Sequence, residues 1–145
     1  MPSLSTLASS FFTVALLATA FAKKHNAGKW SETPVTAASS ELLYATLADE
    51  NAYNSAVEDF ICVRVVEGLE SRASTTNKHV RQADATTSYK FIVGGCLVRK
   101  EFGGRCFDSY FYPACGNFDV VISPTAKTGD YAVKSITVHE VESKH

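Results

Sequence analysis

Four cysteines and four histidines are the side chains of this 145-residue chain that could act as nucleophiles or metal ligands. The cysteines are Cys62, Cys96, Cys106 and Cys115, and the histidines are His25, His79, His139 and His145. No two cysteines have the Cys-x-x-Cys spacing of a zinc site, and no two histidines have the spacing of metal ligands on one helix. The motifs HExxH and GxSxG and a Gly-rich phosphate loop are also absent from the sequence. We therefore expect no metal, no cofactor and no enzyme activity.

Two further residue pairs have simpler structural interpretations than catalysis or phosphate binding. His139 and Glu140 are adjacent in a β-branched segment, so in a regular strand their side chains point to opposite faces. The glycine pairs at 94–95 and 103–104 flank cysteines and no helix follows them, which favours turn or bulge geometry. A Cys–His nucleophile would require a reduced cysteine. These observations favour a binding protein.

The N-terminus predicts export. Residues 11–22, FFTVALLATAFA, form an apolar run too short to span a bilayer but suited to a secretory signal. The run ends in a small-x-small pattern, so we expect a signal peptide at 1–22 and a mature domain at 23–145; the alternative is an uncleaved membrane anchor. In an oxidising compartment an even number of cysteines predicts two disulfides, and four cysteines allow three pairings.

Composition limits the remaining function classes. Apolar residues make up 46% of the chain, charged residues 20%, and the net charge is −1. These are the values of an ordinary globular domain without the basic surface of a general nucleic-acid binder or a polybasic membrane anchor. We expect one soluble extracellular domain with no nucleic-acid partner and no membrane contact after signal cleavage.

The hydrophobic pattern predicts one helix followed by strands. Residues 41–57 have apolar spacing typical of a helix, with Ser39 or Ser40 as the N-cap. Four β-branched segments follow at 59–69, 88–98, 118–123 and 130–141, and a short strand could precede the helix. We expect an α+β fold in which one long helix packs on a four- to five-stranded antiparallel sheet.

A long polar connection separates the first two of these four strands. Residues 70–87 are almost wholly polar, which is unusual for a hairpin loop. The segment is either a solvated loop or a dedicated binding loop, and the sequence does not decide between them.

The layout resembles a secreted, type 2-like cystatin of a divergent arthropod type. The segment AGKWSE at 27–32 resembles the Gly-Gly-Trp opening of that family, and the helix ELLYATLADEN follows at the expected distance. Cys96 and Cys106 follow the strand SYKFIVGG, Cys115 precedes the strand GNFDVVISP, and Pro124 occupies the proline of the second inhibitory loop. The resemblance implies a cystatin-like fold and reversible inhibition of papain-like cysteine proteases by a wedge of three segments.

The resemblance also implies which residues form the wedge. They are Gly28 in the arm, Glu70, Ser71, Arg72, Ala73 and Ser74 at the first loop, and Pro124 and Thr125 at the second. The QxVxG motif is not recognisable, Thr125 replaces the expected tryptophan, and the family's fourth cysteine is missing near 135–138. The simpler interpretations are a strand end and turn at 70–74, a hairpin turn at Pro124, and a Trp30 that packs against the body.

Two consequences follow from these matches and departures. The resemblance implies a Cys96–Cys106 disulfide and with it a Cys62–Cys115 disulfide. The changed loops predict an inhibitor with weakened or altered specificity, and we expect it to be a monomer. The alternative is a cystatin-fold protein that has lost protease inhibition and binds another extracellular protein.

Overall fold

The helix α2 (Ala37–Ala48) begins and ends earlier than the sequence predicts. Thr36 is the N-cap: its Oγ1 accepts a hydrogen bond from the Ser39 backbone N–H at 3.1 Å, and the Ser39 Oγ accepts one from the Thr36 N–H at 2.9 Å. This reciprocal capping box satisfies two backbone donors. The predicted cap at Ser39 or Ser40 was therefore wrong, because Ser39 serves as the third helical residue.

The helix stops at Ala48 because polar side chains offer the backbone another partner. The Asp49 carboxylate accepts a hydrogen bond from the Asn51 N–H at 3.0 Å and begins the 3-10 turn η1 (Glu50–Ala52). Tyr53 then donates its hydroxyl to the Leu47 carbonyl at 2.7 Å, and burial raises the pKa of this phenol well above its usual range. The predicted extension of the helix to residue 57 was wrong.

The computed structural model describes residues 28–74, 86–108 and 110–142. The strands are β1 (Ser31–Glu32), β2 (Phe60–Ser74), β3 (Thr86–Val98), β4 (Gly104–Arg105), β5 (Cys115–Pro124) and β6 (Tyr131–Val138). They form one sheet in the order β1-β2-β3-β5-β6, with antiparallel neighbours, and β4 pairs in parallel with β2. A second 3-10 turn, η3 (Lys100–Phe102), lies between β3 and β4. The expected α+β class is confirmed, but the described sheet has six strands instead of the expected four to five, and the helix, with 12 residues, is shorter than expected.

Strands β2 and β3 are longer than the sequence predicts. Their pairing continues through Arg72 opposite Ser88 to Ser74 opposite Thr86. The residues at 70–74, expected at the start of a loop, therefore belong to a strand. The interpretation of 75–85 as a solvated or binding loop falls outside the described residues.

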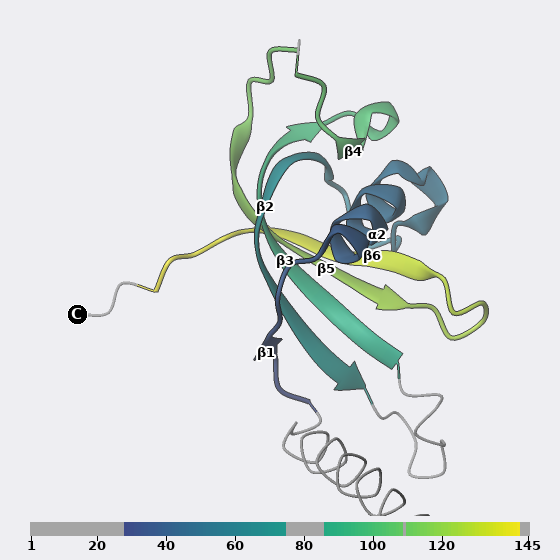
Figure 1. Cartoon of the computed structure of the whole chain (residues 1–145). Helices are drawn as coiled ribbons and strands as arrows, with labels where there is room; N and C mark the ends of the chain where they lie inside the picture. The colour runs from purple at the N-terminus through teal and green to yellow at the C-terminus, as the bar shows by residue number, and fades with distance from the viewer. Residues whose placement is uncertain (1–27, 75–85, 109, 143–145) are drawn as a thin grey trace, which may run out of the picture.

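The core lies between α2 and the sheet (Figure 1). Leu43 and Leu47 of the helix are fully buried against side chains from four strands. The strand members of this core are Ile61, Val63, Leu69, Phe91, Val93, Phe118, Val120, Ile122 and Val133. Among the described residues one α-helix therefore covers one face of the sheet, as the pattern of apolar residues predicts.

Bulges bend the long hairpin of β2 and β3. The register shifts between Val63 and Val65 and again between Val66 and Gly68. Gly95 lies opposite the first shift, where an added Cβ would approach the Cys62 carbonyl oxygen to 2.4 Å. The strand therefore requires glycine at this position, which agrees with the bulge interpretation of the pair at 94–95.

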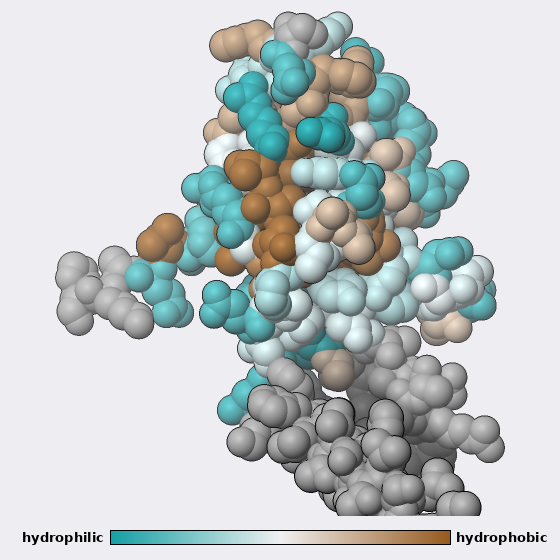
Figure 2. All heavy atoms as spheres, in the orientation of Figure 1, coloured by the Kyte–Doolittle hydropathy of each residue, from teal (hydrophilic) through white to brown (hydrophobic). Residues whose placement is uncertain are grey.

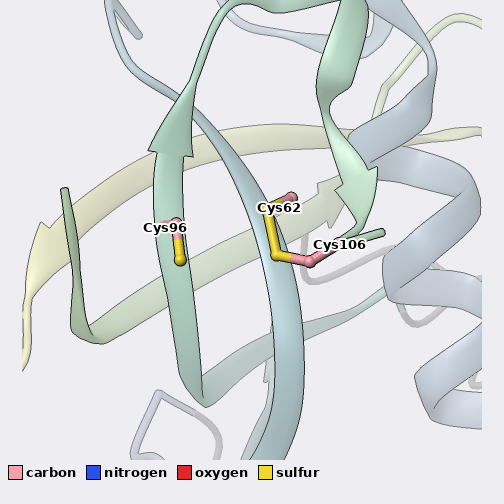
Figure 3. Close-up of side chains that lie close together, drawn as sticks. All are labelled: Cys62, Cys96 and Cys106. Carbon is pink, nitrogen blue, oxygen red and sulfur yellow. A yellow bond between two sulfur atoms is a disulfide. The ribbon is translucent and has the colours of Figure 1, made fainter. Parts of the chain in front are cut away.

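The disulfides are Cys62–Cys106 and Cys96–Cys115, so the expected pairing was wrong. Cys96 of β3 lies directly opposite both Cys62 of β2 and Cys115 of β5. Two strands of separation is roughly 9.6 Å, beyond the approximately 7 Å that a disulfide tolerates between Cα atoms. Cys106 follows β4 and reaches β2 from its other edge, where its N–H donates to the Val63 carbonyl at 3.1 Å. Figure 3 shows this bond beside Cys96.

Candidate functional site

The N-terminal arm runs along the end of β2. In β1, Ser31 pairs with Ser71, and the Thr33 N–H donates to the Leu69 carbonyl at 2.9 Å. The Thr33 and Ser71 hydroxyls lie 2.7 Å apart. Gly28 precedes this strand with a φ of +98° and open space around it. The arm is therefore fixed from Ser31 onward, and Gly28 lies exposed at its described beginning.

Trp30 packs on the protein's own sheet. The guanidinium of Arg72 lies 4.4 Å from the centre of its ring, and the ammonium of Lys90 lies at 5.3 Å. Lys90 also forms an ion pair with Glu70. These four side chains, which we call the Trp30 cluster, hold the arm against β2 and β3 through cation–π and ionic contacts. They agree with the interpretation of Trp30 as a packing residue.

The five candidate residues at 70–74 therefore differ in what they can offer a partner. Glu70, Ser71 and Arg72 contact neighbouring parts of the same chain, whereas Ala73 is exposed on β2. Ser74 is the last residue of the strand. Of the residues whose side chains are described, Ala73 is the free one.

The second candidate loop is a closed hairpin turn. Pro124 is the last residue of β5 and pairs with Tyr131 of β6. The Thr125 N–H donates to the Asp130 carbonyl at 2.8 Å, and the Gly129 N–H donates to the Thr125 carbonyl at 3.0 Å. Pro124 thus precedes the turn directly, in agreement with the turn interpretation, and Thr125 is held by the hydrogen bonds of the turn.

Side-chain contacts tie the two hairpins together at this end of the sheet. The Ser123 hydroxyl donates to the Ser88 Oγ at 2.8 Å, and the Tyr131 hydroxyl donates to the Thr87 carbonyl at 3.1 Å. Burial, followed by the neighbouring Tyr89, raises the pKa of Tyr131 to about 12. The ends of β2, β3, β5 and β6 therefore form one connected edge.

The three sequence-predicted segments are thus at the same end of the sheet. Both hairpins extend toward the right and lower right of Figure 1, and β1 lies to their left along β2. We call Gly28, Ala73, Pro124 and Thr125, together with the backbone that carries them, the hairpin edge. It offers small side chains and the closed turn between Thr125 and Asp130.

An aromatic pocket lies at the opposite end of the sheet, and the sequence interpretation missed it. It has a volume of about 400 Å³ and is lined by Leu97, Val98, Arg99, Phe102, Tyr110, Tyr112 and Pro113. The Tyr110 ring centre lies 6.3 Å from that of Phe102 and 6.1 Å from that of Tyr112. The sequence feature that could have indicated this pocket is the high density of aromatic residues between Cys96 and Cys115. Two further members of this segment, Phe107 and Phe111, are also exposed.

The visible face of the sheet itself is partly apolar. Figure 2 shows apolar side chains gathered over the middle of β2 and β3, with polar ones around them. On β2, Val65 has 49% of its surface exposed.

His139 has a partner that the sequence did not indicate. Its Nδ1 lies 2.7 Å from the Asp119 Oδ1, and both side chains are about one-quarter exposed. The expected role at a solvated sheet edge missed this contact, which depends on the register between β5 and β6. His139 follows the last residue of β6, and its N–H donates to the Asn117 carbonyl at 2.9 Å.

Three sulfur atoms form the only cluster of potential metal ligands among the described residues. The Sγ atoms of Cys62, Cys96 and Cys106 lie within 4.8 Å of one another. All four cysteines are engaged in disulfides, whereas metal binding requires thiolates. In the oxidised protein the three sulfur atoms therefore serve as disulfide partners and not as metal ligands.

No family model matches the chain, and no solved structure matches it. Within residues 28–74, 86–108 and 110–142, no helix has the length and apolar character needed to cross a membrane. The expected signal peptide at 1–22 lies outside the described residues.

Proposed function

We propose that this protein is a secreted, monomeric, cystatin-like inhibitor of papain-like cysteine proteases with altered specificity. The observation that carries the proposal is the hairpin edge, where the arm and two hairpin ends lie at one end of the sheet. The order of one helix followed by two long hairpins on one sheet supports the cystatin-like assignment. Two disulfides agree with an oxidising compartment.

The mechanism is reversible occupation of a protease cleft without chemistry. Gly28, Ala73, Pro124 and Thr125 enter the cleft, and the Trp30 cluster holds the arm in place behind them. Glu70 and Arg72 are positioning residues, because their side chains contact the protein's own sheet. The ties between the hairpins reduce the conformational entropy lost on binding.

The small side chains of the hairpin edge set the expected affinity. Burying a Val-sized side chain contributes about 1.5–3 kcal/mol, and losing an interfacial Trp costs about 2 kcal/mol or more. Because each 1.4 kcal/mol is roughly a tenfold change, we expect binding several orders of magnitude weaker than that of a cystatin with intact loops. The proteases that are inhibited should then be those whose active-site cleft can accommodate the hairpin edge.

Charge substitution at two exposed alanines tests the proposal. Ala73→Glu puts a carboxylate on the hairpin edge, and Ala114→Glu puts the same group at the opposite end of the sheet. Burying an unpaired carboxylate is costly, so Ala73→Glu should weaken inhibition of papain at least tenfold, while Ala114→Glu leaves it unchanged. Equal effects of the two variants would contradict the proposed edge.

A second candidate function is binding of a small apolar molecule without protease inhibition. The aromatic pocket favours it, because its volume of about 400 Å³ falls within the usual range of small-molecule sites. Arg99 at the wall supplies a positive charge for an anionic group.

The pocket can be probed with anilinonaphthalene sulfonate, an aromatic anion whose fluorescence rises in apolar sites. Tyr110→Ala removes a lining ring, whereas Phe111→Ala removes a ring that is 88% exposed and does not line the pocket. We expect Tyr110→Ala to weaken binding severalfold and Phe111→Ala to leave it unchanged. Equal dye binding by both variants and the parent protein would dismiss this site.

A further inference from the structure

The cysteines form a continuous row across three strands. Cys62 and Cys96 are directly opposed on β2 and β3, and Cys96 and Cys115 are directly opposed on β3 and β5. Directly opposed residues of antiparallel strands carry their side chains on the same face. The existing Cys96–Cys115 disulfide is itself such a cross-strand bond, with Cα atoms 3.9 Å apart. A bond between Cys62 and Cys96 would also join directly opposed residues, but at a hydrogen-bonded pair, because the Leu97 N–H donates on the β5 side and the Cys96 backbone therefore points to β2.

The two disulfides are close enough to react with each other. The Sγ atoms of Cys62, Cys96 and Cys106 all lie within 4.8 Å, although Cys96 is bonded to neither of the other two. Figure 3 shows the Cys96 sulfur beside the Cys62–Cys106 bond. A thiolate formed at Cys96 would therefore have a disulfide sulfur as its neighbour.

Exposure is unequal along the row. Cys62 and Cys96 have 0% of their surface exposed, whereas Cys115 is exposed at the beginning of β5. Cys115 is therefore the exposed member of the row, and the two central cysteines are shielded from solvent. Disulfide exchange depends on which sulfur is accessible to the attacking thiolate.

We propose that the four cysteines form a thiol-exchange site in which Cys115 is the point of S-thiolation by a small thiol. The thiolate of that small molecule attacks Cys115, forms a mixed disulfide with it, and releases Cys96 as a thiolate. Cys96 then attacks Cys62, which forms a Cys62–Cys96 disulfide and releases Cys106 as a thiolate that takes up a proton. Each step exchanges one sulfur–sulfur bond for another, so no oxidant is consumed.

The consequence is that thiolation at one end of the row frees a thiol at the other end. Thiolation at Cys115 frees Cys106, which holds the segment after β4 against the edge of β2. That segment leads into the aromatic pocket, because Tyr110, Tyr112 and Pro113 follow it. The exchange would therefore remove a covalent restraint on the pocket wall.

The first experiment uses the oxidised protein and glutathione as the small thiol. The protein is exposed to limiting glutathione at neutral pH, alkylated, digested without reduction, and mapped by mass spectrometry. We expect glutathione on Cys115, the alkyl label on Cys106, and a linked Cys62–Cys96 peptide in comparable amounts. The alkyl label on Cys96 together with an intact Cys62–Cys106 bond would overturn the proposal.

Two matched variants should form the same Cys62–Cys96 disulfide, each after removal of a different outer cysteine of the row. Cys115→Ser leaves Cys96 without its partner, and Cys106→Ser leaves Cys62 without its partner. Both variants should contain the Cys62–Cys96 bond, with Cys106 alkylated in the first and Cys115 in the second. Retention of the remaining native bond in both folded variants would contradict the exchange. If either variant fails to fold, the glutathione experiment on the unchanged protein decides.

Discussion

Trp30 should stabilise the fold through the cations on its ring. Arg72 and Lys90 lie 4.4 Å and 5.3 Å from the ring centre, within the distance of about 6 Å at which cation–π attraction is effective. At exposed sites each such contact contributes about 0.5–1 kcal/mol, so Trp30→Ala should lower the free energy of unfolding by about 1–2 kcal/mol. Loss of apolar contact by the indole adds to this value.

A double-mutant cycle isolates the Arg72 contribution. Arg72→Gln removes the cation but keeps a long polar side chain, and urea unfolding gives the free energy of each variant. The coupling energy between Trp30→Ala and Arg72→Gln should be about 0.5–1 kcal/mol. The matched control is Arg99→Gln, since Arg99 is exposed at the other end of the sheet.

The coupling energy measured with Arg99→Gln is the value against which the Trp30–Arg72 coupling is compared. Arg99→Gln should show no coupling to Trp30→Ala, because distant sites are additive. A coupling between Trp30 and Arg72 no larger than in this control would refute the cation–π account. The arm would then depend on β1 pairing alone.

Three further predictions test the packing of the sheet and the helix. Gly95→Ala should lower the free energy of unfolding by at least about 2 kcal/mol, because its Cβ would lie 2.4 Å from the Cys62 carbonyl oxygen. Gly116→Ala should cost far less, because its Cβ would lie 3.9 Å from the Phe118 ring; urea titration compares the two variants. Leu43→Ala removes a fully buried helix side chain and should cost about 2–5 kcal/mol in the same assay. Because the pKa of Tyr131 is raised from 10.0 to about 12, its stabilising contribution is complete below pH 10 and is lost as pH rises toward 12. Tyr131→Phe should show a smaller decline in urea midpoint over that range, and an unchanged decline would contradict this assignment.

The sequence predicts the elements better than their limits. Apolar periodicity is sufficient to place a helix before a set of strands, because core-facing positions repeat with characteristic spacings. The helix boundaries were wrong because Thr36 and Ser39 cap each other and Asp49 begins a separate turn. Such local hydrogen bonds depend on backbone conformation that a hydrophobic pattern does not encode.

The length of β2 shows how tertiary pairing overrides composition. Residues 70–74 are polar and contain no apolar alternation typical of a half-buried strand. They nevertheless pair with β3, and Ser31 of the arm pairs with Ser71 on the other side. The strand is extended by its neighbours, which lie far away in the sequence.

The disulfides and the His139–Asp119 contact depend on register. The resemblance implied bonds by order along the chain, whereas the sheet puts Cys96 between Cys62 and Cys115. The shift between Val121 and Ile122 likewise changes which residues of β5 and β6 are opposite. Neither a bulge position nor a cross-strand neighbour follows from residue types alone.

The candidate wedge residues were identified by resemblance, and their position at one end of the sheet is a feature of topology. Two consecutive hairpins return their tips to the same end whenever the intervening connection lies at the other. The individual roles could not be assigned from the sequence, because they depend on tertiary contacts. The Arg72 guanidinium packs on the Trp30 ring, whereas the neighbouring Ala73 is exposed to solvent.

The inhibition constant of the purified, oxidised protein for papain tests the central claim most directly. It should be measured against a peptide substrate at several substrate concentrations, with a panel of related proteases for comparison. We predict reversible, competitive inhibition in the micromolar range. Absence of inhibition at about 100 μM, where about 5.5 kcal/mol of binding would already be detected, would contradict the claim.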